Sequence, residues 1–290
     1  MQQALKVPDV LMRLNEPTDQ ETKLKRAFAL CLLFPLIASA QTGSGESFNP
    51  VPGQPGKDVV WVPTPYALVE RMLDMAKVTP QDYVIDLGSG DGRNVIMAAK
   101  RGARALGVEY NAEMVELSRR SAAKEGVAGR ARFVQGDMFE ADISQATVLA
   151  LFLLPDNLRR LTPKFQSQLK PGTRLVMNGF PIPEWSPDLT ETATGDCGNW
   201  CTSHLYYAPA RVGGSWRLAQ GTLRFEQSFQ MLSGTLNRAP IAAGRLKGEE
   251  ISFTVGDSQY VGRVNGNVMS GEMKGPRPGQ WRATRIGHDH

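Results

Sequence analysis

The sequence predicts an α/β fold, with helices on both faces of a mainly parallel sheet, followed by a small antiparallel β domain. A short β-branched strand that runs into closely spaced glycines, with alternating strand and helix patterns after it, predicts the first part. Short alternating strands separated by glycines predict the second. We expect an N-terminal extension with a leader (1–40), a linker (41–57), the α/β domain (58–219) and the β domain (220–290).

A glycine-rich turn follows the first expected strand. Tyr83-Val-Ile-Asp-Leu leads into Gly88-Ser-Gly-Asp-Gly92, and glycine lets a backbone turn sharply and approach a ligand closely before a helix starts. A nicotinamide dinucleotide site favours G-x-G-x-x-G, whereas the sixth position here is Arg93. The spacing therefore favours S-adenosylmethionine over NAD.

Acidic residues end the next two expected strands. After a helix over 94–101, the strand 104–109 ends in Glu109, which is placed to accept hydrogen bonds from ribose hydroxyls. After a helix over 112–126, the strand that starts at Ala131 ends in Asp137, close to the expected adenine. This order is typical of the Rossmann-like fold of class I methyltransferases. The candidate cofactor-binding residues are Thr64, Asp86, Gly88, Ser89, Gly90, Asp91, Gly92, Glu109, Asn111, Asp137 and Met138.

A helix is expected just before the first strand. Val59 to Pro65 reads as an extended segment, with Thr64 as the N-cap and Pro65 at the first helical position. Apolar residues at helical spacing after Pro65 predict one face packed on the sheet. Thr64 is either a cap alone or a cofactor contact.

Several segments resemble a known family. They are Val62-Pro-Thr-Pro65, Asp86 to Arg93, Val148-Leu-Ala-Leu-Phe-Leu-Leu-Pro155, Leu169-Lys-Pro-Gly172 and Phe180-Pro-Ile-Pro-Glu-Trp185. Over about residues 60 to 187 the chain is similar to the mitochondrial protein-lysine methyltransferases that modify the ATP synthase c subunit and the ADP/ATP translocase, and to their bacterial relatives. The glycine turn is common to all class I methyltransferases. The similarity to lysine enzymes therefore depends on Leu153-Leu-Pro155, after the fourth expected strand, and on Phe180 to Trp185, after the fifth.

The resemblance implies lysine N-methylation with S-adenosylmethionine as cofactor. It places Asp86 and the three glycines around the methionine end of the cofactor, Glu109 at the ribose and Asp137 near the adenine. A lysine must be neutral to attack, and an apolar channel lowers its pKa by desolvation; Phe152, Phe180 and Trp185 are candidates for that channel. No dedicated catalytic base is assigned. The substrate-side candidates are Leu154, Pro155, Asn178, Phe180 and Trp185.

Two other functions stay open. A narrow pocket at Leu154 and Pro155 suits methylation of a small apolar acceptor. A non-catalytic module that binds a nucleoside is the third hypothesis. An Asn-Pro-Pro-Tyr type of motif is absent after the fourth strand, which disfavours base or glutamine methylation, and no recognition helix or aromatic-basic platform indicates nucleic-acid binding.

The N-terminal segment has the features of a secretory signal. Lys23-Leu-Lys-Arg26 precedes an apolar run to Ile37 and then Ala38-Ser-Ala40, the usual order of a basic region, an apolar region and a small-residue cleavage site. We expect cleavage between Ala40 and Gln41 and a periplasmic protein, or a tethered protein if the signal is kept. Cys31 belongs to this signal. Because S-adenosylmethionine is made in the cytoplasm, export raises the question of its supply.

The last expected feature of the α/β domain is an antiparallel strand pair, 202–207 with 214–218. Just before it stand Cys197 and Cys201, which form a disulfide or remain thiols; zinc would need two further ligands, so we expect no metal.

The β domain reads as a β-meander or half-barrel. Gly244 to Ser252 and Gly262 to Ser270 echo one another, which predicts one hairpin unit used twice. The domain is basic, whereas residues 41–210 are slightly acidic, so it either contacts an anionic surface weakly or has a solubilising surface. The oligomeric state is not predicted. The expected core of the β domain consists of Phe225, Phe229, Leu236, Phe253, Tyr260 and Trp281.

Overall fold

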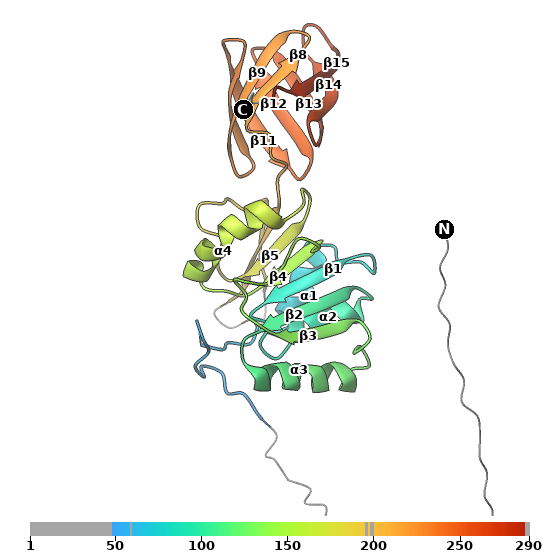
Figure 1. Cartoon of the computed structure of the whole chain (residues 1–290), viewed down its shortest axis with the longest axis vertical. Helices are drawn as coiled ribbons and strands as arrows, with labels where there is room; N and C mark the ends of the chain where they lie inside the picture. The colour runs from blue at the N-terminus through green and yellow to red at the C-terminus, as the bar shows by residue number, and fades with distance from the viewer. Residues whose placement is uncertain (1–47, 59, 195–196, 198–199, 288–290) are drawn as a thin grey trace, which may run out of the picture. The chain divides into compact units, whose positions relative to one another are not determined.

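The computed structural model describes residues 48–58, 60–194, 197 and 200–287, coloured in Figure 1. The expected leader, its cleavage site and Cys31 lie outside these residues. None of the helices within the described part is long and apolar enough to cross a bilayer.

The α/β domain is built on a seven-stranded sheet with the strand order β3-β2-β1-β4-β5-β7-β6. Five strands are parallel, and β7 and β6 are antiparallel at one edge. The chain reverses its direction of travel across the sheet between β1 and β4, the point where open α/β sheets bind ligands. The strands are β1 (Tyr83–Leu87), β2 (Arg104–Glu109), β3 (Ala131–Gln135), β4 (Val148–Leu151), β5 (Arg174–Asn178), β6 (Leu189–Thr192) and β7 (Thr202–Tyr207).

Helices cover both faces of this sheet, as the sequence predicts (Figure 1). α1 (Tyr66–Met75), α2 (Arg93–Lys100) and α3 (Ala112–Lys124) bury apolar residues with one set of strand side chains, and α4 (Pro155–Gln168) packs on the other set. The two sets alternate along each strand because successive side chains point to opposite faces. Consecutive residues such as Val84 and Ile85 therefore belong to different cores.

The antiparallel edge differs from the prediction. Thr202–Tyr207 does pair at the edge, but its partners are β5 and β6, and Gly214–Leu218 belongs to the second domain. The prediction of that strand pair was wrong because β6 is mostly exposed and lacks the alternation that marks a strand in sequence.

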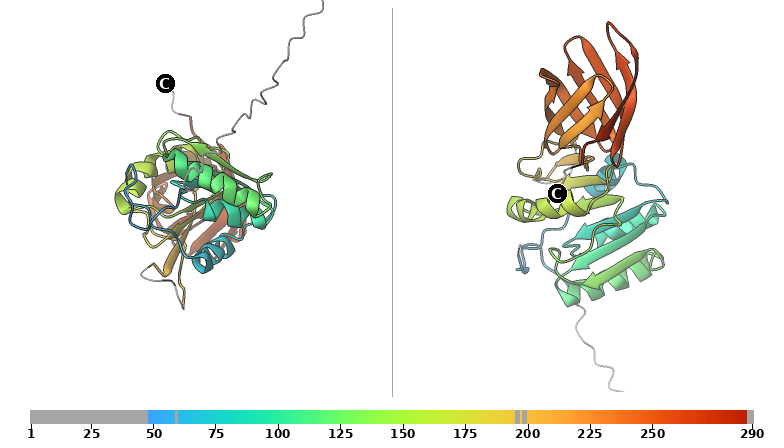
Figure 2. Two further views of the ribbon diagram at one scale, coloured as in Figure 1. Left: turned by 90° about the horizontal axis from the view of Figure 1, so that it is seen from below. Right: turned by 45° about the horizontal axis from the view of Figure 1, so that its top comes forward.

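The second domain is a closed barrel (Figure 2, right). Its strand order is β10-β11-β12-β13-β14-β15-β8-β9, and pairing of β15 with β8 closes it, so it is more than the expected half-barrel. The repeated unit forms the hairpins β11–β12 and β13–β14, as predicted. The strands are β8 (Gly214–Leu218), β9 (Gly221–Ser228), β10 (Met231–Leu236), β11 (Ala239–Lys247), β12 (Glu250–Val255), β13 (Ser258–Asn265), β14 (Val268–Lys274) and β15 (Gly279–Arg285).

The aromatic residues expected in the β domain fill the barrel, with one exception. Phe253 stacks on Tyr260 with ring centroids 4.6 Å apart, and Trp281 meets both rings edge-on. Phe229 instead lies in the β9–β10 turn and stacks on Trp185, with centroids 5.1 Å apart. A turn residue lies outside the in-and-out alternation of the strands it connects, which explains the error.

Candidate active site

The glycine turn contributes Gly88 to the wall of the candidate site. Gly88, Gly90 and Gly92 all have positive φ, at +73°, +54° and +81°. A Cβ on Gly90 would lie 2.6 Å from Nε1 of Trp61, and one on Gly92 would lie 2.6 Å from Cε1 of Phe133. Both the backbone conformation and the available space therefore require glycine here.

Glu109 is held against this turn by backbone donors. The amide N–H of Gly90 donates to one carboxylate oxygen and the N–H of Asn111 donates to the other, each at 2.9 Å. Asn111 also caps α3, because its Oδ1 accepts from the N–H groups of Glu113 and Met114. The carboxylate is fixed at the end of β2 with further lone pairs able to accept hydrogen bonds.

Asp86 lies behind the turn and is 3% exposed. Burial raises the pKa of its carboxyl well above the usual range. The Asn94 amide, which donates a hydrogen bond to Asp86 at 3.1 Å, lowers this pKa, whereas the nearby carboxylates of Glu109 and Asp91 raise it further. Oδ1 of Asn94 has no hydrogen-bond donor. A neutral Asp86 is therefore the form that this site favours.

A cavity of about 230 Å³ opens at the carboxyl ends of the parallel strands. One end of it carries polar groups from the loops after β2 and β3, and the other is apolar and aromatic. Of the predicted residues, those that line it are Gly88, Glu109, Asn111, Asp137, Met138, Phe152, Leu154 and Phe180.

The end of the expected linker and the start of the α/β domain also line the cavity. Residues 54–57 of the linker and residues 58 and 60–62 after it contribute to its wall. Nζ of Lys57 lies 2.6 Å from the Asp137 carboxylate and 4.5 Å from the centre of the Tyr110 ring. This ion pair lowers the pKa of Asp137, and the loop places Trp61 against Gly90. The stretch up to Lys57 is rich in glycine, proline and serine, which predicts irregular backbone but not which part of the fold it contacts.

The other predicted cofactor residues surround the turn without lining the cavity. Asp91 forms an ion pair with Arg93. The carbonyl of Thr64 accepts from Arg93, and its hydroxyl lies 3.3 Å from the Asn178 amide. α1 starts at Tyr66 with Pro65 at the N-cap position and no side-chain cap, so the prediction that Thr64 is the cap was wrong by one residue. Ser89 is buried and its hydroxyl has no partner.

Three substrate-side candidates do not line the cavity. Pro155 is the first residue of α4, and Asn178 is 1% exposed at the end of β5. Trp185 is 2% exposed because it packs between Tyr206 and Phe229. Trp185 is therefore part of the core.

Trp200 takes the place that the sequence assigned to Trp185. It lines the cavity together with Phe152 and Phe180, from a loop that precedes β7. The sequence did not predict this role, because the position of Trp200 depends on the antiparallel pairing of β7 with β5, which is set by contacts between residues distant in sequence. Its only local signal is its place beside Cys201.

The described residues fit S-adenosylmethionine. Three features match a nucleoside ligand at a helix N-terminus. The glycine turn has no room for Cβ atoms, the Glu109 carboxylate is held by backbone donors, and the cavity lies next to both. Unpartnered polar atoms also remain at the turn and the end of β5, namely the Ser89 hydroxyl and the Asn178 carbonyl. Each lacks the partner that buried polar atoms normally have.

Comparison with known proteins decides the family. The profile of the ANTKMT methyltransferase domain matches residues 86–189. A protein-lysine N-methyltransferase of Saccharolobus islandicus is 49% identical over 151 residues, which are 51% of this chain and 92% of that protein. The chain belongs to the protein-lysine N-methyltransferase family. It is a class I methyltransferase, and S-adenosylmethionine is its methyl donor.

Two further relatives show how far the similarity extends. The human lysine N-methyltransferase named for the ATP synthase c subunit is 36% identical over 128 residues, which are 44% of this chain and 54% of that protein. A crystal structure of an RNA methyltransferase from Salinibacter ruber with S-adenosyl-L-homocysteine is 44% identical, covers 52% of this chain and 96% of that one, and has a TM-score of 0.49. This methyltransferase thus spans nearly all of the archaeal relative and about half of the human one.

Proposed function

We propose that this methyltransferase methylates the side-chain amine of lysine in an acceptor protein. The observation that carries the proposal is the apolar, aromatic end of the cavity, beside the carboxyl ends of β4 and β5. Its walls there are Phe152, Leu153, Leu154, Phe180 and Trp200. The family supports lysine, because the archaeal and human relatives are both named as lysine methyltransferases.

The reaction needs a neutral amine aligned with the methyl group. S-adenosylmethionine would supply a methyl group on a sulfonium; the amine attacks the methyl carbon in line with the C–S bond, and the neutral thioether S-adenosylhomocysteine leaves. No titratable side chain lies among the five walls of the apolar end. Desolvation by these walls lowers the pKa of a lysine and favours the neutral amine, and water removes the proton before attack. The protein therefore acts by positioning and by excluding solvent.

Labelling with a radioactive methyl donor tests the proposal. We expect the pure protein, incubated with methyl-labelled S-adenosylmethionine and envelope extract, to place label in protein and, after hydrolysis, in methylated lysine. Gly90→Arg should abolish labelling, because Trp61 already fills the space beside Gly90. Persistent labelling by that variant would assign the activity to a contaminant.

The alternatives give different outcomes in the same assay. Label found in the organic phase would favour the small apolar acceptor. Label in nucleic acid would contradict the lysine proposal. Calorimetric binding of S-adenosylmethionine without transfer to any fraction would favour the binding module.

We also propose that the mature protein acts outside the cytoplasm. The leader pattern supports this, and so does the disulfide between Cys197 and Cys201, since such bonds persist in oxidising compartments. Expression of the full chain should yield a periplasmic protein that begins at Gln41 by N-terminal sequencing. An uncleaved protein that fractionates with the cytoplasm would contradict it. Contact of the basic barrel with an anionic surface stays a prediction.

A further inference from the structure

Three aromatic rings meet at the apolar end of the cavity. Ring centroids are 5.0 Å apart for Phe180 and Trp200, 5.5 Å for Phe152 and Trp200, and 6.4 Å for Phe152 and Phe180. All three are only partly buried and all line the cavity, unlike the core residue Trp185. They form an aromatic wall, defined by these three residues, that is open to a ligand.

The backbone makes room for this wall. Phe152 follows β4 and Phe180 follows β5, with Gly179 between Phe180 and the strand. Gly179 has φ +72°, and a Cβ there would lie 3.0 Å from Cε3 of Trp200 and 3.4 Å from Cε2 of Phe152. A larger residue would push the rings away from the strand ends.

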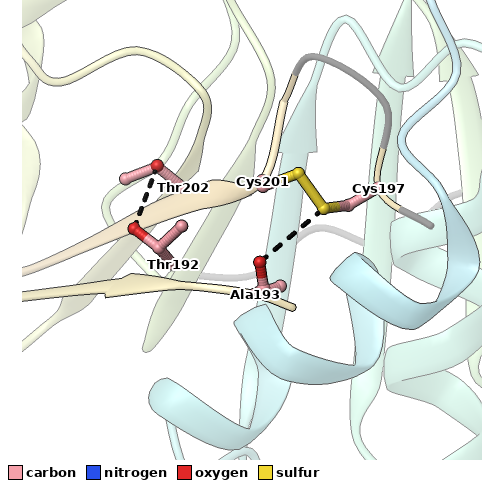
Figure 3. Close-up of a disulfide and its surroundings, with 5 residues drawn as sticks. All are labelled: Thr192, Ala193, Cys197, Cys201 and Thr202. Atoms are coloured by element: carbon pink, nitrogen blue, oxygen red, sulfur yellow. Dashed lines mark hydrogen bonds between the residues drawn. A yellow bond between two sulfur atoms is a disulfide. The ribbon is translucent and has the colours of Figure 1, made fainter. Parts of the chain in front are cut away.

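A disulfide holds the third ring. Cys197 and Cys201 are bonded beside Ala193, which follows β6 (Figure 3). The backbone N–H of Trp200 donates to the Cys197 carbonyl at 3.3 Å, and the N–H of Ala193 donates to the Cys201 carbonyl at 2.8 Å. Trp200 therefore projects from a short covalent ring anchored beside the sheet edge.

We propose that Trp200 binds the acceptor lysine and that the Cys197–Cys201 disulfide positions Trp200 for this purpose. The inference rests on the proposed function and names the residue that selects its substrate. An aromatic face packs against the alkyl chain of lysine and attracts the ammonium before deprotonation and after transfer. Glu109 and Asp137 at the polar end of the cavity would hold the cofactor, so Trp200 would act on the acceptor and not on cofactor binding.

Three variants test the proposal against the full protein. Trp200→Ala should lower the initial rate of labelling at low extract concentration by about tenfold, the size expected for loss of a desolvated aromatic–cation contact. Its calorimetric Kd for S-adenosylmethionine should stay within about twofold of the wild type, since the contacts of Glu109 are intact. Trp200→Phe should recover most of the rate, whereas Trp200→Leu, which keeps apolar bulk without the ring, should not.

The disulfide is tested by its effect on apparent KM. The double variant Cys197→Ser, Cys201→Ser should label several-fold more slowly at low extract concentration, with the deficit shrinking at high concentration. Met231→Ala, an exposed change on the barrel, is the matched surface control and should label as the wild type. Thermal unfolding checks that each variant folds. If Trp200→Ala does not fold, the comparison of Trp200→Phe with Trp200→Leu tests the role of the ring.

Two results would overturn the inference. Equal labelling by Trp200→Leu and the wild type at low extract concentration would remove Trp200 from acceptor binding. If Trp200→Ala lost affinity for S-adenosylmethionine together with its labelling rate, Trp200 would be a structural support of the cofactor site. By contrast, a wild-type protein that binds S-adenosylmethionine but labels no protein would remove the proposed function itself.

Discussion

Glu109→Ala will weaken binding of S-adenosylmethionine by about 100-fold or more, because a hydrogen bond to a charged group contributes roughly 1.5–3 kcal/mol and the ribose offers two hydroxyls. The carboxylate is already oriented by the N–H groups of Gly90 and Asn111, so little ordering is needed on binding. Titration calorimetry of the two proteins measures the difference.

Two further variants distinguish the effect of the Glu109 charge on binding from a general disturbance of the structure around it. Glu109→Gln should also lose at least about tenfold in affinity, because one end of the amide cannot accept from the backbone donors that the carboxylate satisfies. Glu113→Ala removes an exposed carboxylate from the first turn of the adjacent helix and should bind as the wild type. An unchanged Kd for Glu109→Ala would place the nucleoside elsewhere.

Asp86→Asn will stabilise the free protein at neutral pH while weakening cofactor binding by about tenfold or more. The pKa of Asp86 is raised in the folded protein, so above the ordinary aspartate pKa the unfolded chain ionises while the folded carboxyl resists ionisation. Stability is therefore lost as pH rises from the ordinary pKa toward the raised one. An amide at position 86 does not ionise, so it avoids this loss of stability. Its N–H group can also donate a hydrogen bond to Oδ1 of Asn94, which has no partner.

The methionine part of the cofactor carries a sulfonium, an ammonium and a carboxylate, so its net charge is positive. A net positive charge nearby favours ionised Asp86. Binding should therefore release protons in the wild type, and affinity should rise as pH rises through the pKa of free Asp86. Calorimetry in two buffers with different ionisation enthalpies measures the release, and thermal unfolding at several pH values measures stability. Proton release of equal size in Asp86→Asn, or a lower melting temperature at neutral pH, would contradict this account.

Local sequence patterns were sufficient to predict those parts of the site whose residues are close together in the sequence. The glycine turn needs positive φ over a few residues, and Glu109 follows from the end of one strand, so both could be recognised without knowing the fold. Asp137 and Met138 were found in the same way, and both line the cavity.

The missed residues depend on contacts between distant segments. Lys57 reaches Asp137 across eighty residues, from a segment whose composition predicts only irregular backbone. Trp200 reaches Phe152 and Phe180 because β7 reverses direction beside β5. Closure of the barrel likewise requires β15 to pair with β8, which no local alternation encodes.

A crystal structure with S-adenosyl-L-homocysteine bound tests the central claim most directly. We expect the ribose hydroxyls on the Glu109 carboxylate, the adenine beside Asp137 and Lys57, and the sulfur directed toward the aromatic wall. A ligand bound away from Glu109, with the cavity empty, would contradict it.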